Sequence, residues 1–176
     1  TFWTFFTQIF HAKASCRNAL LRLTAARFAD NPSDDEPLYT GTYCKARQRL
    51  PESLFTRIRR GIADRAEAQA QVWHWNGHAV KIPDGTTVSM PDTKANQEAF
   101  PQSKNQKRGI GFPLAQLVAI ISLATGCILR TRLGPCKGKG SGETSLLAQM
   151  LSEFQAKDLV VADAGFSYYW LIASLK

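Results

Sequence analysis

A chain of 176 residues with 44% hydrophobic side chains is long enough for one domain with a small attachment and too apolar for wholesale disorder. Its 22 lysines and arginines against 14 acids give a net charge of +8, which suits a polyanionic partner such as DNA or RNA but fits plain solubility equally well. Four cysteines without C-x-x-C spacing argue against a zinc site and a disulfide framework, and the longest apolar run, 114–129, is too polar and too short for a membrane helix of about 20 residues.

Residues 1–70 have the pattern of a small helical module. Aromatic residues at helical spacing occupy 2–10, Ser15 and Thr42 suit the N-caps of a second and a third helix, and Pro51 suits the first turn of a fourth. Basic side chains decorate the last two of these helices. The module is therefore a candidate DNA-binding domain, with a solvated charged face as an equally good interpretation.

From residue 71 onward the pattern changes to strands. The predicted elements in chain order are strands 72–75 and 78–82 around the turn Asn76-Gly77, a hairpin of 117–123 with 127–133, a helix 142–154, a strand 159–162 and a helix through 168–172. Three antiparallel strands, a crossover helix and a parallel strand match a mixed sheet of the ribonuclease H type. The predicted fold class is therefore α/β, with an incomplete sheet of this type over 71–176.

Two aspartates end predicted apolar strands and precede glycines. Asp84 closes the stretch HAVKIPD before Gly85, and Asp163 closes LVVAD before Ala164 and Gly165. Neighbouring strands lie about 4.8 Å apart, so adjacent strands would bring both carboxylates together, beside glycines that leave room for a ligand. A divalent cation relieves their repulsion, with Mg²⁺ as the first choice and Mn²⁺ as the alternative. The competing interpretation, with Asp84 as a turn residue and Asp163 as a helix cap, stays open.

The segment between the two aspartates includes a long stretch whose charged residues are all basic. No acid occurs between Glu98 and Glu143, and a stretch of this kind inside a folded region is typical of a binding face. Its basic residues are the candidate DNA contacts: Lys104, Lys107, Arg108, Arg130, Arg132, Lys137 and Lys139. Glu143 is interpreted as a first-turn glutamate that favours the helix dipole, and Asp92 as a brace of the loop after Asp84. Neither acid is assigned to the metal.

Seven blocks of sequence, taken in their order along the chain, carry a further signal. The downstream blocks are IPDGTTVSMPDTKANQEAFPQ, GIGFPLAQLVAIISLATG, GPCKGKGSGETSLLAQML and DLVVADAGFSYYWLIASL, and the upstream blocks are TFWTFFTQIF, SCRNALLRL and TGTYCKARQRLPESLF. Together these blocks resemble bacterial insertion-sequence transposases. The resemblance is to the IS-four family within the Asp-Asp-Glu superfamily. It implies a ribonuclease H-like core that cuts and joins DNA ends with Mg²⁺, in which Asp84 and Asp163 match the first two catalytic acids.

The third acid of that family, a glutamate, lies well downstream of the second aspartate, and no acid follows Asp163 here. We therefore expect a fragment of a DNA transposase with little or no strand-transfer activity of its own. The expected partners are transposon ends, target DNA and an intact transposase, in the cytoplasm at the nucleoid and away from membranes. Two alternatives stay open: a non-catalytic DNA-binding or inhibitory product of a truncated element, and a metal-dependent nuclease without sequence preference.

Overall fold

The computed structural model describes residues 1–13, 15–32, 39–103, 105, 107, 109–136, 138 and 140–175. Its contacts divide the chain into two compact units, Thr1–Thr56 and Arg57–Lys176. Helix α4, Glu52–Gln69, contributes to both units, and Pro51 lies immediately before it. The predicted division near residue 70 falls at the end of this helix and stays a prediction.

The first unit is built from helices, as the sequence predicts. Helices α1, α2 and α3 are Phe2–Ile9, Cys16–Asp30 and Thr40–Gln48. The Ser15 hydroxyl accepts a hydrogen bond from the backbone N–H of Asn18 at 3.2 Å, which confirms the predicted N-cap of α2. The predicted cap at Thr42 is wrong, because α3 already begins at Thr40, two residues earlier.

A small polar cluster joins the three helices of this unit. The Tyr43 hydroxyl donates to Gln8 Oε1 at 2.7 Å, and Arg47 Nη1 donates to the same oxygen at 3.1 Å. The Cys44 thiol donates to Cys16 Sγ at 3.5 Å. Gln8 and Tyr43 are buried, so these hydrogen bonds satisfy polar groups that would otherwise destabilise the interior.

This cluster makes the unit sensitive to alkaline pH. The pKa of the Cys44 thiol is raised, first by its hydrogen bond to Cys16 and then by burial, and burial is the main cause that raises the pKa of the Tyr43 hydroxyl. In the unfolded chain the Cys44 thiol and the Tyr43 hydroxyl have pKa values near their ordinary values, 9.0 and 10.0. In the folded unit both groups stay protonated to higher pH. These two groups therefore contribute fully to the stability of the folded unit below the pKa values that they have in the unfolded chain. The contribution is lost as pH rises through the pKa values that they have in the folded unit.

We expect the melting temperature of the chain to fall when the pH is raised from about 8 to about 10.5. The Tyr43→Phe/Cys44→Ser variant should show a smaller fall over the same interval, because it lacks both groups. Thermal unfolding followed by circular dichroism at the two pH values measures this difference. An equal fall in the variant and the wild type would mean that other groups control the alkaline response.

The chain enters the second unit through α4 and a short 3-10 helix, η1, Gln71–Trp73. The predicted strand 72–75 is therefore wrong. The N–H of Trp73 bonds to the carbonyl of Ala70 at 2.8 Å, and this contact three residues back turns the chain at the end of α4. The turn that follows is as predicted: Trp75 and His78 exchange backbone hydrogen bonds of 3.0 and 2.9 Å around Asn76-Gly77.

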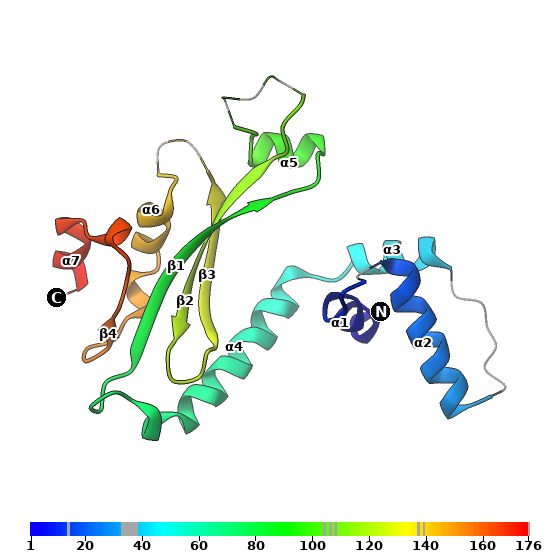
Figure 1. The fold of residues 1–176 in the computed structure, drawn as a ribbon, viewed down its shortest axis with the longest axis horizontal. Coiled ribbons are helices and arrows are strands. Elements are labelled where there is room, and N and C mark those ends of the chain that lie inside the picture. Colours follow the sequence, from blue (N-terminus) through cyan, green and yellow to red (C-terminus); the bar gives the residue numbers. More distant parts are fainter. Residues whose placement is uncertain are drawn as a thin grey trace. The chain divides into compact units, whose positions relative to one another are not determined.

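Four strands then form one mixed sheet. They are β1 (Val80–Ser89), β2 (Leu114–Ser122), β3 (Ile128–Pro135) and β4 (Leu159–Val160), in the order β3-β2-β1-β4 (Figure 1). The pairs β1–β2 and β2–β3 are antiparallel, and β4 joins β1 in parallel. This order confirms the predicted α/β fold class with a partial ribonuclease H-like sheet. Helix α5, Lys94–Ala99, between β1 and β2, was not predicted.

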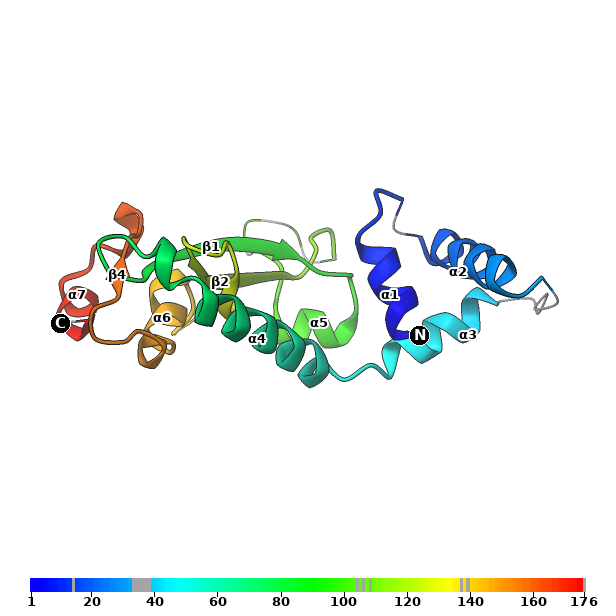
Figure 2. The same cartoon turned by 90° about the horizontal axis from the view of Figure 1, so that it is seen from below.

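The core of this unit lies on one face of the sheet. Buried residues of β2 meet those of helix α6 (Glu143–Ala148), the 3-10 helix η3 (Ala164–Phe166) and helix α7 (Tyr169–Leu175), and Figure 2 shows α6 beneath the strands. The cluster comprises Val118, Ile120, Leu146, Leu147, Met150, Phe166 and Leu171. The predicted helix 142–154 is too long, because bonds from residues 149 and 150 to carbonyls three residues back end α6 before a second 3-10 helix, η2 (Leu151–Glu153).

Candidate active site

Asp84 lies in the middle of β1 and not at the end of a strand. Residues 85–89 continue the strand, because they pair with residues 118–114 of β2. Asp84 is exposed, and its Oδ1 accepts a hydrogen bond from the N–H of Gly85 at 2.8 Å. The interpretation of Asp84-Gly85 as a turn is therefore wrong, since both residues are extended within the sheet.

Asp163 follows β4 at the start of η3. Its Oδ1 accepts a hydrogen bond from the N–H of Gly165 at 2.9 Å, so this residue does cap a short helix. The side chain is exposed, which leaves the rest of the carboxylate open to solvent. The cap and a role as a cation ligand are compatible, because a carboxylate offers about four acceptor positions.

The pairing of β1 with β4 relates the two aspartates. Val80 pairs with Leu159 and Lys81 with Val160, so the partner in β4 is 79 positions later in both pairs. Asp163 is the residue at the same offset from Asp84. Beyond the paired residues, Val161 N–H still donates to Lys81 O at 3.0 Å. The pairs of this ladder end three residues before Asp84 and three residues before Asp163.

The space beside Gly85 is occupied by Glu143, an acid that the sequence did not assign to the metal site. A Cβ at Gly85 would overlap the side chain of Glu143, so this carboxylate lies directly on β1, one residue after Asp84. Glu143 Oε1 accepts a hydrogen bond from Gln116 Nε2 at 2.8 Å. The expectation that Gly85 leaves room for a ligand is thus wrong for this glycine. A glycine inside a strand often marks a close approach, and that signal could have suggested the contact.

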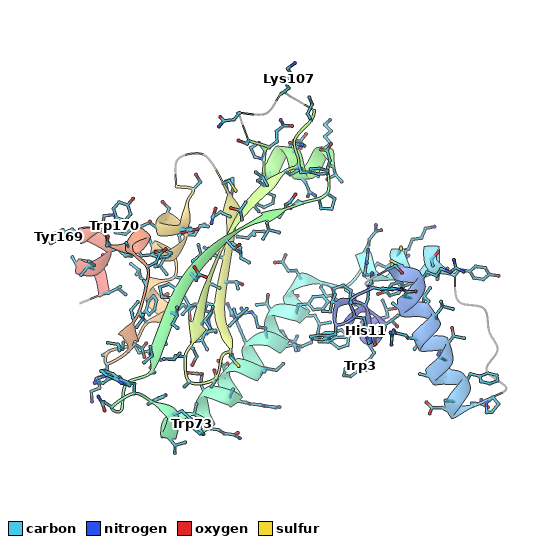
Figure 3. The ribbon with its side chains drawn as sticks, viewed as in Figure 1. Trp3, His11, Trp73, Lys107, Tyr169 and Trp170 are labelled. Atoms are coloured by element: carbon cyan, nitrogen blue, oxygen red, sulfur yellow. The ribbon has the colours of Figure 1, made fainter. Side chains whose placement is uncertain are left out.

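A hollow of about 550 Å³ opens beside this carboxylate. Gln116 of β2 and Glu143 and Thr144 of α6 line one part of it, and Tyr168 and Trp170 line another. Figure 3 shows Trp170 and its neighbour Tyr169 at α7, close to the outer surface of this unit. Neither Asp84 nor Asp163 lines this hollow, whereas Asp163 lines a separate hollow of about 390 Å³ between β4 and α7.

The candidate DNA contacts are not all equally available. Lys104, Arg108, Lys137 and Lys139 lie outside the described residues. Lys107 is exposed and projects away from the sheet (Figure 3). Arg132 is exposed and donates from Nε to Gln149 Oε1 at 3.1 Å, whereas Arg130 Nε lies 2.7 Å from Glu153 Oε2 in an ion pair that lacks hydrogen-bond alignment.

A further basic residue has a structural role that the sequence did not indicate. Arg59 of α4 donates from Nη1 to the carbonyl of Ile128 at 2.9 Å and also to that of Leu129. Burial, followed by repulsion from Arg130 and Arg60, lowers the pKa of its guanidinium. Arg59 thus attaches the middle of α4 to β3 instead of presenting its charge to solvent.

The donor atoms of Asp84 and Asp163 suit a hard cation. Both are exposed carboxylates, and neither takes part in an ion pair between described side chains. Oxygen ligands of this kind are the ones that Mg²⁺ and Mn²⁺ prefer. Within the described part of the chain, however, no group of three or more potential metal-ligand side chains is found.

A comparison with protein families gives this geometry a context. Residues 75–176, more than half of the chain and nearly all of the unit that carries both aspartates, match the family model described as "Transposase DDE domain". The chain belongs to this transposase family. The family acts on DNA and generally uses divalent metals, which agrees with the oxygen donors of the two aspartates. No curated protein and no solved structure matches the chain significantly. Among the described helices, none could cross a membrane.

Proposed function

We propose that Asp84 and Asp163 are two of the catalytic carboxylates of a metal-dependent DNA transposase. The observation that carries the proposal is the parallel pairing of β4, which ends three residues before Asp163, with β1, which contains Asp84, inside the matched domain. The proposed branch is the IS-four family, on the blocks of sequence that resemble it. The proposed partners are transposon ends and target DNA at the nucleoid, with an intact transposase as a further partner.

In this proposal the two carboxylates hold Mg²⁺, with Mn²⁺ as a substitute. Bound at a site of this kind, a pair of cations about 3.5–4 Å apart supplies the charge that activates a water and stabilises the leaving oxygen of a phosphodiester. The protein side chains contribute the anchor points. Asp84 is carried by the rigid centre of β1, and Asp163 is oriented by its hydrogen bond to the N–H of Gly165.

The chain alone is proposed to have little or no strand-transfer activity. No acid follows Asp163 within residues 164–176, and two carboxylates hold a cation less tightly and orient its water less well than three. The second candidate function is a non-catalytic DNA-binding or inhibitory product, which the net charge of +8 favours. Lys107 and Arg132 are the described residues best placed to contact DNA, while Arg130 is engaged by Glu153.

Binding of Mn²⁺, measured from the free-ion signal in electron paramagnetic resonance, tests the metal site. We expect Asp84→Asn and Asp163→Asn each to weaken Mn²⁺ binding at least about tenfold, a loss of about 1.4 kcal/mol. Asp92→Asn is the matched control, because Asp92 is also exposed and lies in the segment after β1. Equal affinities in the Asp84 and Asp92 variants would contradict the proposal.

A DNA-binding assay with the same variants separates the candidate functions. Binding to a DNA duplex that survives both aspartate substitutions, without cleavage in Mg²⁺ by any variant, supports a DNA-binding product. Nicking of an unrelated plasmid in Mg²⁺ or Mn²⁺ that requires both aspartates points instead to a nuclease without sequence preference.

A further inference from the structure

The first turn of α6 contacts the segments that carry both aspartates. Glu143 lies on Gly85, the residue after Asp84, where any Cβ would overlap its side chain. The next residue, Thr144, donates from its hydroxyl to the carbonyl of Gly165 at 3.5 Å, two residues after Asp163. Two consecutive residues of one helix thus connect β1 with η3, at the place where β4 no longer pairs with β1.

Glu143 is held in this place from the side of the sheet. Gln116 of β2, itself 9% exposed, donates to Glu143 Oε1 at 2.8 Å and accepts from the Thr87 hydroxyl at 3.4 Å. Thr87 and Gln116 are directly opposite in the β1–β2 register. The chain of contacts from Thr87 through Gln116 to Glu143 therefore ties α6 to both strands, beside Asp84.

These contacts fit a residue that positions others better than one that binds the cation itself. One carboxylate oxygen of Glu143 is committed to Gln116, and the described residues contain no group of three side chains arranged to hold a metal. Glu143 lies on the backbone of Gly85, so its position limits where β1 lies relative to α6. The hydrogen bond of Thr144 to Gly165 likewise limits where the turn after Asp163 lies relative to α6.

We propose that Glu143 and Thr144 are positioning residues that fix the spacing between the segments of Asp84 and Asp163. The inference rests on the proposed function, because that spacing matters if the two carboxylates share a cation. A displacement of about 1 Å is enough to impair such a site, and groups that support metal ligands typically affect metal affinity about 10- to 100-fold.

Distances between spin labels test the spacing without altering either aspartate. In the full chain, with the four native cysteines replaced by serine, labels are attached through Thr86→Cys and Ser167→Cys, both exposed positions close to Asp84 and Asp163. We expect Glu143→Ala/Thr144→Ala to broaden the distance distribution measured by dipolar electron paramagnetic resonance. An unchanged distribution overturns the inference.

Two variants keep the test specific. Glu143→Gln retains the shape and an acceptor for Gln116, so it should keep the distance distribution of the parent. Gln149→Ala is the matched control at the other end of α6, because it removes hydrogen bonds to Arg132 and Ser145 but touches neither aspartate segment. Thermal unfolding of every variant establishes that each one is folded.

Mn²⁺ affinity then measures the consequence for the site. We expect Glu143→Ala to weaken binding about tenfold, and Glu143→Gln and Gln149→Ala to leave it within about twofold. A loss in Glu143→Gln as large as in Glu143→Ala overturns the inference, since the charge itself would then act on the cation. If the wild-type chain binds no Mn²⁺, the proposed function fails, and the label distances alone decide whether Glu143 and Thr144 fix the spacing.

Discussion

Replacing Leu147 with alanine is expected to lower the free energy of unfolding of the sheet unit by about 3 kcal/mol. Leu147 is 1% exposed and packs between α6 and the face of β2 that carries Val118 and Ile120. The substitution removes buried methyl groups and leaves a cavity that the surrounding strands fill only in part. Urea unfolding followed by tryptophan fluorescence measures the loss, because Trp73, Trp75 and Trp170 lie in this unit.

Leu133→Ala is the matched control for this prediction. Leu133 belongs to β3 in the same sheet but is 45% exposed, so its truncation should cost less than about 1 kcal/mol. A Leu147 variant as stable as the Leu133 variant would mean that α6 does not pack on the sheet as described.

Replacing Asp158 with alanine is expected to lower the free energy of unfolding by about 3–5 kcal/mol. Asp158 forms an ion pair with Lys81 of β1, and the two side chains are only 9% and 11% exposed. Lys81 also donates to the carbonyl of Glu153 at 2.8 Å, while Asp158 Oδ2 accepts from the N–H of Gln155 at 2.7 Å. Without Asp158, the ammonium group would remain in this poorly solvated position with no counter-charge.

The double variant Lys81→Met/Asp158→Leu distinguishes the cost of an unpaired charge from the value of the pair. It should unfold at a higher urea concentration than Asp158→Ala, because two apolar side chains need no counter-charge. Lys107→Ala, which removes an exposed cation, serves as the control for a general charge effect and should leave stability unchanged. If the double variant were less stable than Asp158→Ala, the attraction within the ion pair would exceed the free energy that is lost when its two charges are buried.

Local signals in the sequence are sufficient for several elements. Two apolar segments around Ala124-Thr125-Gly126 are enough to predict the β2–β3 hairpin, and the structure adds that Gly126 has a φ of +66° there. Ser15 indicated the start of α2 in the same way, through a hydrogen bond to a residue three positions away. Such features depend on neighbours along the chain, so the identity of a few residues is enough to predict them.

Other elements depend on contacts that no local pattern contains. The aromatic stretch at 72–75 reads as a strand, yet it finds no partner strand and forms η1. Asp84-Gly85 reads as a turn, yet pairing with β2 extends β1 as far as Ser89. Propensity is a weak prior in such short segments, and the available partners determine the outcome.

For the candidate site, the sequence alone indicated the transposase family and made Asp84 and Asp163 the candidate catalytic residues. Only the tertiary structure decided that β4 pairs in parallel with β1, that Glu143 takes the space beside Gly85, and that Glu153 engages Arg130. The physical reason is that these features depend on contacts between residues that are distant in the sequence. Residue type and alternation express the chemistry and burial of each segment, but register, close approach and ion pairing arise between residues far apart in the chain, and they exist only once the sheet has formed.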